Sequence, residues 1–173
     1  LVKKGAFASY SLQQEVGADL PMTREEAIGI ITDIIPSDSV VVSTTGMASR
    51  ELYEYRDRIN DNHSKDFLTV GGMGHALQIA LGIALEKSNR TIICMDGDGA
   101  ALMHLGGMGI VASQHVPNYK HILLNNGVHG SVGGQPTVGF DVDFCAVAKA
   151  VGYKDAVKAD SAESLKAVLP TFL

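Results

Sequence analysis

The sequence predicts an α/β fold, a doubly wound and predominantly parallel sheet with helices on both faces. Short β-branched or apolar runs, each the length of a buried strand, alternate with longer helical patterns along the chain. Several of these runs end in a glycine-containing turn that opens the next helix. Ligands of such folds bind outside the carboxyl ends of the strands, so the turns there are the first candidates for function.

The length of 173 residues suits one domain with its own hydrophobic core. Residues 1–22 lack a sustained hydrophobic period, and we interpret them as a linker or docking arm that precedes a domain at 23–173. Position 1 is Leu rather than Met, so we expect the chain to be the C-terminal part of something longer.

The domain is expected to start with a helix. Thr23 and Glu26 form the sequence pattern of a capping box, and Pro36 ends the helical period that follows. The β-branched run Ser39–Thr44 predicts a buried strand, and a polar helix is expected from Met47 to about Arg58.

The same alternation continues through the rest of the chain. Asp66–Val70 predicts a short strand, four residues that include three glycines follow it, and an apolar helix is expected from His75 to Glu86. The remaining elements expected are a strand at Thr91–Met95, one helix after Asp98, a strand at His121–Leu124, helices at Val142–Val151 and Ser161–Phe172, and a last strand near Ala156–Ala159.

Two polar turns follow neighbouring predicted strands. Gly97-Asp98-Gly99-Ala100 ends the first strand and opens a helix, and Asn125-Asn126-Gly127 ends the second. A parallel crossover brings both turns to one sheet edge, where a carboxylate and a carboxamide suit Mg²⁺ bound to a phosphate. Asp-Gly is also an ordinary turn, and Asn-Gly a common hairpin turn. We expect no hairpin, because no antiparallel partner strand is recognisable within the next few residues.

The spacing of these turns resembles the thiamine diphosphate motif of the thiamine-dependent decarboxylases. The resemblance implies thiamine diphosphate and Mg²⁺ as cofactors, with the metal held by Asp98, the side-chain oxygen of Asn126 and the carbonyl of Val128. Gly71-Gly72-Met73-Gly74 is similar to the segment that grips the aminopyrimidine ring, with Met73 wedging the cofactor into its bent conformer; from the residues alone, Met73 also fits a core methionine. The implied cofactor-binding residues are Thr45, Gly46, Gly71, Gly72, Met73, Gly97, Asp98, Gly99, Ala100, Asn126, Val128, His129 and Gly130.

Nearly all of the chain from Thr23 resembles the phosphonopyruvate decarboxylase family, with sulfopyruvate decarboxylase close to it. The segments that carry this resemblance are 42–52, 66–71 and 124–137. A glutamate often follows the histidine of the last segment in that family, whereas Gly130 follows His129 here. The resemblance implies a 2-oxo acid substrate, a homo-oligomer, and a separate pyrimidine-binding domain or subunit that supplies the activating glutamate. The alternatives are another 2-oxo acid decarboxylase or, from a different class, a non-catalytic phosphate- or nucleotide-binding module.

A phosphonate substrate would need positive or hydrogen-bonding side chains. The substrate-side candidates are Arg50, His75, His129, Ser131 and Gln135, although Arg50 also fits a solvated helix residue and Ser131 a turn former. The remaining histidines, among them His104 and His121, belong to no recognisable constellation and are expected to be structural.

Composition excludes several classes of protein. The net charge of −5 and the scattered basic residues argue against nucleic acid, and no apolar run approaches the ~20 residues that span a bilayer. Cys94 and Cys145 both lie in apolar segments and are interpreted as small buried residues rather than as a disulfide, a metal pair or a nucleophile. Free thiols and the lack of a recognisable leader favour a cytoplasmic protein.

Overall fold

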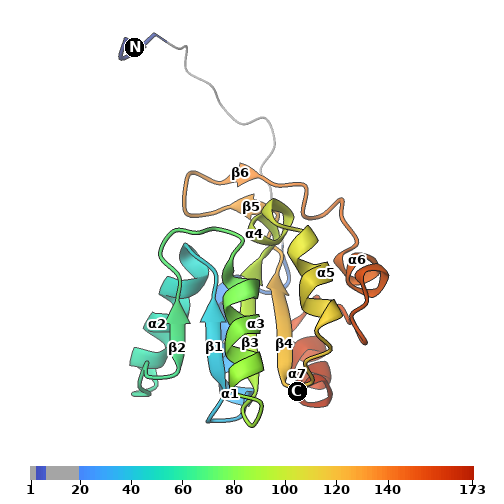
Figure 1. Cartoon of the computed structure of the whole chain (residues 1–173). Coiled ribbons are helices and arrows are strands. Elements are labelled where there is room, and N and C mark those ends of the chain that lie inside the picture. The colour runs from blue at the N-terminus through green and yellow to red at the C-terminus, as the bar shows by residue number, and fades with distance from the viewer. Residues whose placement is uncertain (1–2, 7–19) are drawn as a thin grey trace.

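The computed structural model describes residues 3–6 and 20–173. Its main sheet contains the strands β1 (Val40–Ser43), β2 (Asp66–Leu68), β3 (Ile92–Gly97) and β4 (Tyr119–Leu124). Their order is β2-β1-β3-β4, and every neighbouring pair is parallel (Figure 1). All four carboxyl ends therefore meet at one edge of the sheet, as the sequence predicts.

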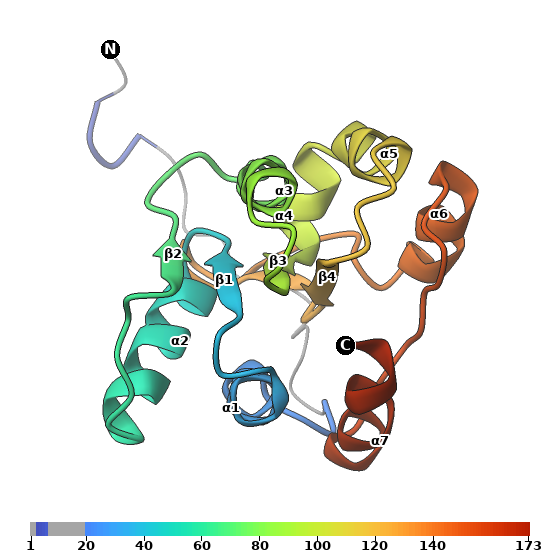
Figure 2. The ribbon, with the colours of Figure 1, turned by 60° about the horizontal axis from the view of Figure 1, so that its bottom comes forward.

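Helices cover both faces of this sheet (Figure 2). They are α1 (Arg24–Ile34), α2 (Met47–Arg58), α3 (Ala76–Glu86), α4 (Asp98–Met103), α5 (Gly106–Ser113), α6 (Phe144–Val151) and α7 (Ala162–Phe172). Val41 and Val42 point to opposite faces, because side chains alternate along a strand. Val41 packs into a core with α1, α2 and α7, and Val42 into a core with α3, α5 and α6. The doubly wound prediction is confirmed.

The first helix begins at the predicted capping box. Thr23 Oγ1 accepts a hydrogen bond from Glu26 N at 3.1 Å, and Glu26 Oε2 accepts one from Thr23 N at 2.8 Å. The helix ends at Ile34, two residues before Pro36, because proline disfavours a helical conformation in the residue that precedes it.

The single helix predicted between Asp98 and the next strand was wrong, because the structure has two. The chain breaks at His104 and Leu105, between α4 and α5. Gly106 and Gly107 follow the break, and glycine is a poor helix former. Gly107 also lies against the side chain of Gln78, where a Cβ atom would clash, so a glycine there lets α5 approach α3 closely.

The strand predicted near Ala156–Ala159 was also wrong. These residues form no ladder with the sheet. Ala156 packs into the core on one face and Ala159 into the core on the other. The segment thus crosses from one face to the other between α6 and α7, and a chain that crosses the edge cannot pair along it.

An antiparallel pair follows Asn125-Asn126-Gly127, contrary to expectation. Its strands, β5 (Val128–His129) and β6 (Gln135–Pro136), are joined by the intervening glycine-rich loop, and Asn126-Gly127 is not their turn. This hairpin lies across the carboxyl ends of the main strands (Figure 1). Its strands are two residues long, which is too short for a recognisable alternation of side chains.

The predicted linker or docking arm at 1–22 falls mostly outside the described residues, and its role stays a prediction. Within the part of the chain that the structure describes, no helix is long and apolar enough to span a membrane.

Candidate functional site

The loops after β1 and β2 meet beside the hairpin. Thr45 Oγ1 accepts a hydrogen bond from Gly71 N at 3.1 Å. Gly46 has a positive φ of 98°, and a Cβ atom there would lie 3.1 Å from Ser131 Oγ. Three segments far apart in the sequence are therefore held together at the carboxyl edge.

The Gly71–Gly74 segment needs its glycines for conformation and for packing. Gly71, Gly72 and Gly74 have φ values of 74°, 59° and 82°, a region that other residues rarely adopt. A Cβ atom on Gly74 would also lie 2.9 Å from the carbonyl oxygen of Ala100. The segment thus packs directly on the start of α4 and carries Met73 toward it.

Gly99 lies beneath two of the predicted cofactor-binding side chains. A Cβ atom on Gly99 would lie 2.5 Å from His129 Cε1 and 3.3 Å from Met73 Cε. We call Met73, Gly99 and His129 the cradle. Gly99 lies in the first turn of α4, His129 in β5 and Met73 in the loop after β2. A side chain larger than that of glycine at position 99 would displace the other two side chains.

Asp98 is a buried carboxylate at the first position of α4, with 3% of its surface exposed. The Thr137 hydroxyl donates a hydrogen bond to Asp98 Oδ2. Within the described residues no Lys, Arg or His forms an ion pair with Asp98. A buried charge without a cationic partner is costly, which makes this position suited to a bound cation.

Gly139 closes the site above Asp98. A Cβ atom there would clash with Asp98 Oδ2 and would lie 2.5 Å from Asn125 Oδ1. Asn125 Nδ2 donates to the Gly139 carbonyl oxygen at 2.7 Å. The sequence did not assign a role to Asn125, Thr137 or Gly139. Asn125 belongs to the polar turn predicted at this edge, and the signal for the other two was a run of small and hydroxyl residues after the glycine-rich hairpin.

The neighbouring amide, Asn126, turns back on its own loop. Its Oδ1 atom accepts a hydrogen bond from Val128 N at 3.3 Å. No hydrogen bond joins Asn126 to Asp98 in the described part of the chain. Gly130 lies beside Arg24, where a Cβ atom would be 3.6 Å from Nη1, and so faces the start of α1.

Comparison with known proteins shows which family this domain belongs to. Residues 44–173 match the family described as "Thiamine pyrophosphate enzyme, C-terminal TPP binding domain". The chain belongs to this family. It is thus a domain that binds thiamine pyrophosphate, also called thiamine diphosphate, as the resemblance implies.

This thiamine diphosphate domain is similar to two decarboxylases in sequence and to a third in structure. It is 43% identical over 151 residues to phosphonopyruvate decarboxylase of Streptomyces viridochromogenes, covering 87% of this chain and 36% of that protein. It is 38% identical over 132 residues to sulfopyruvate decarboxylase subunit beta of Methanothermobacter thermautotrophicus, covering 76% and 68%. The crystal structure of benzoylformate decarboxylase from Polynucleobacter necessarius shares its fold with a TM-score of 0.72 at 21% identity, over 92% of this chain and 33% of that one. The domain thus spans about a third of the length of the phosphonopyruvate decarboxylase.

The substrate-side candidates of this thiamine diphosphate domain separate into different places. Arg50 and Ser131 line one hollow of about 520 Å³ at the ends of β1 and β2. His75 lies in another hollow, where its ring is 4.4 Å from that of His104 between centroids. His129 covers Gly99, and Gln135 is exposed on the hairpin beside Gly133.

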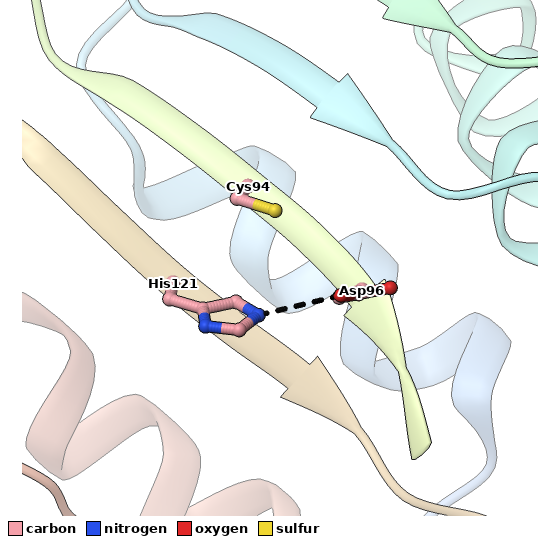
Figure 3. Close-up of side chains that lie close together, drawn as sticks. All are labelled: Cys94, Asp96 and His121. Carbon is pink, nitrogen blue, oxygen red and sulfur yellow. Dashed lines mark ion pairs between the residues drawn. The ribbon is translucent and has the colours of Figure 1, made fainter. Parts of the chain in front are cut away.

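A buried polar cluster lies below the cofactor edge, in the core of the domain. Cys94 is fully buried, as expected, and Cys145 is half-buried; both thiols are free. Burial, together with the nearby charge of Asp96, raises the pKa of the Cys94 thiol well above its usual range, so it is no nucleophile. His121, expected to belong to no constellation, lies beside Asp96 and Cys94 (Figure 3).

Proposed function

We propose that the chain is the cofactor-binding half of a phosphonopyruvate decarboxylase, which converts 3-phosphonopyruvate to phosphonoacetaldehyde and CO₂. The cradle of Met73, Gly99 and His129 is the observation that carries this proposal, because it is built at the sheet edge of a thiamine diphosphate-binding domain. The choice of substrate rests on the 43% identity to two phosphonopyruvate decarboxylases. The proposal includes a cytoplasmic location, an oligomeric enzyme and a partner domain.

The residues beside Asp98 fit a magnesium ion. Mg²⁺ prefers oxygen ligands and usually takes one or two carboxylates together with phosphate oxygens. Asp98 supplies a buried carboxylate, and the Asn126 side-chain oxygen and the Val128 carbonyl would add two neutral oxygens. The Thr137 hydroxyl, which donates to Asp98 Oδ2, would orient that carboxylate toward the metal.

The residues around Gly99 fit the organic cofactor. The lack of a large side chain at Gly99 and Ala100 would let a diphosphate approach the backbone. Met73 would support the bend of the cofactor, and the Gly71 carbonyl would accept a hydrogen bond from the aminopyrimidine. When bound, the thiazolium ring accepts the electrons that a 2-oxo acid leaves behind as it loses CO₂. The work of this chain is to bind and orient, and the acid–base group would come from the partner domain.

Substrate recognition would use the polar side chains along the same edge. A phosphonate carries more negative charge than the carboxylate of a simple 2-oxo acid, and a guanidinium binds such groups well. Arg50 and Ser131 share one hollow and are the first candidates for the phosphonate. His129 would face the reacting end from its place over Gly99. Gln135, which is paired in register with His129, and His75, two residues after Met73, lie outside the hollow of Arg50 and Ser131.

A side-by-side assay tests the proposal. The chain together with its pyrimidine-binding partner is expected to turn over phosphonopyruvate faster than sulfopyruvate or pyruvate, and to need both thiamine diphosphate and Mg²⁺. The chain alone is expected to be inactive, because it lacks the activating glutamate. Preference for another 2-oxo acid, or rapid turnover without the partner, would contradict it.

Sulfopyruvate decarboxylase is the second candidate function. One observation favours it: the chain covers 68% of a protein whose name identifies it as the beta subunit of that enzyme. The same assay separates the two substrates. Thermal-shift measurements with thiamine diphosphate and with nucleotides, each with Mg²⁺, separate both from a non-catalytic nucleotide-binding module.

A further inference from the structure

The polar cluster below the cofactor edge has its own geometry, which the proposed function does not use. We call Cys94, Asp96 and His121 the buried cluster. Cys94 and Asp96 alternate along β3, and Cys94 is paired in register with His121 on β4, so all three side chains lie on one face of the sheet. Figure 3 shows the three side chains close together, with the His121 ring on β4 directed toward Asp96 on β3.

Within the described residues, two atoms of the buried cluster have no hydrogen-bond partner. They are Asp96 Oδ2 and His121 Nε2, both buried, and they face each other at 3.6 Å. Charge-assisted hydrogen bonds are shorter, about 2.7–2.9 Å. Two ligands at about 2.0–2.1 Å from a tetrahedral zinc ion lie about 3.4 Å apart, so the observed gap matches an edge of such a site. Cys94 Sγ completes a set of three atoms within 4.8 Å of one another.

The other polar atom of Asp96 and of His121 already has a hydrogen-bond partner. Asp96 Oδ1 accepts a hydrogen bond from Gly97 N at 2.9 Å. His121 Nδ1 lies 3.1 Å from the Tyr153 hydroxyl, which leaves Nε2 directed into the cluster. Metal-bound histidines and carboxylates are oriented in this way, by a hydrogen bond on the atom that does not bind the metal.

We propose that Cys94, Asp96 and His121 bind a zinc ion that joins β3 to β4 below the cofactor site. The Cys94 thiol gives up its proton to solvent as the metal binds, and the resulting thiolate and the Asp96 carboxylate cancel the charge of Zn²⁺. A neutral complex is the form that a low-dielectric interior tolerates. A water molecule completes the tetrahedron. The ion also fixes Asp96, two residues before the predicted magnesium ligand Asp98.

Metal analysis of the full-length protein tests this site independently of the cofactor. The protein is unfolded, refolded with Zn²⁺, and separated from free metal, because all three ligands are buried and loading must accompany folding. We expect about one zinc ion per chain, held by the three buried protein ligands and one water molecule. Refolding with Co²⁺ is expected to give the intense visible bands of a tetrahedral site and a thiolate charge-transfer band.

Matched variants separate this site from others. Cys94→Ala and His121→Gln are expected to lose the zinc, and Tyr153→Phe to weaken its affinity by about 10- to 100-fold, as loss of an outer hydrogen bond does. Cys145→Ala removes the other free thiol and is expected to keep the zinc, as is Asp98→Ala.

Three results would overturn the proposal. The first is a folded wild-type chain that retains no zinc. The second is zinc lost with His104→Gln but kept with Cys94→Ala, which would assign the ion to the exposed His75 and His104 pair. The third is a Co²⁺ spectrum of the wild-type protein without a thiolate band. This result would show that Cys94 does not bind the metal, even if Cys94→Ala fails to fold.

Discussion

Gly99→Ala tests the cradle by adding a single methyl group. Gly99 lies in the first turn of α4, where alanine is compatible with the backbone. The new Cβ atom would lie 2.5 Å from His129 Cε1 and 3.3 Å from Met73 Cε. The histidine ring must therefore move from its place over Gly99, and the position expected to receive the diphosphate becomes narrower.

The magnitude follows from the cost of overpacking. Added methyl groups in well-packed sites cost about 1–3 kcal/mol. Each factor of ten in affinity corresponds to about 1.4 kcal/mol, so we expect thiamine diphosphate to bind about 5- to 140-fold more weakly. The ligand-free chain is expected to keep its thermal stability, because His129 is only half-buried and its ring can turn toward solvent.

Calorimetric titration of thiamine diphosphate with Mg²⁺ measures this effect, on the chain combined with its pyrimidine-binding partner. Gly109→Ala in α5 is the matched control, because a Cβ atom there meets nothing within 4 Å. In the His129→Ala background, Gly99→Ala is expected to cost less affinity than in the wild type, because the ring that the new methyl group meets is gone. Equal affinity in Gly99→Ala and wild type would refute the reasoning.

Three further outcomes are expected. Asp98→Ala should abolish the magnesium dependence of cofactor binding by calorimetry, since it removes the only charged ligand predicted for the metal, and an unchanged titration would remove that assignment. Leu52→Ala should lower the free energy of unfolding by about 2–5 kcal/mol in urea titrations, because Leu52 is fully buried between α2 and the sheet; a loss near zero would contradict the described packing. The hydrogen bonds that Glu26 accepts from Thr23 lower the pKa of its carboxyl group. The capping box should therefore stabilise the fold at pH values above the unfolded-state pKa, and this stabilisation should be lost as the pH falls through the folded-state pKa. In thermal melts, Glu26→Gln should lack this acid-dependent loss of stability. The same pH profile in the variant and the wild type would argue against a role for the Glu26 carboxylate.

Local patterns predicted most of the secondary structure correctly. Thr23 and Glu26 cap the first helix as expected, and β1, β2, β3 and β4 lie within a few residues of the predicted strands. These features depend on neighbours in the sequence, through hydrogen bonds within a turn or through the alternation of side chains. The parallel pairing of β3 with β4 was also expected, because a strand–helix–strand crossover returns the second strand beside the first.

The errors fall where distant segments override the local pattern. A strand was expected between α6 and α7, yet this stretch crosses the edge of the sheet and pairs with no described strand. Two helices stand where one was expected after Asp98, and the second of them packs closely on α3 at Gly107 and Gln78. The short β5–β6 hairpin depends on its position over the end of the sheet, because strands of two residues are too short to show a recognisable alternation of side chains.

The sequence by itself determined the fold class and predicted the glycine-rich turns at one edge of the sheet, where the cofactor site is proposed. Their signals are local, since they depend on strand length, turn conformation and motif spacing. Only the tertiary structure brought His129 over Gly99, Asn125 to Gly139 and His121 beside Asp96. These contacts join separate loops or strands, and their geometry depends on strand register and on many weak packing interactions that no single stretch of sequence contains.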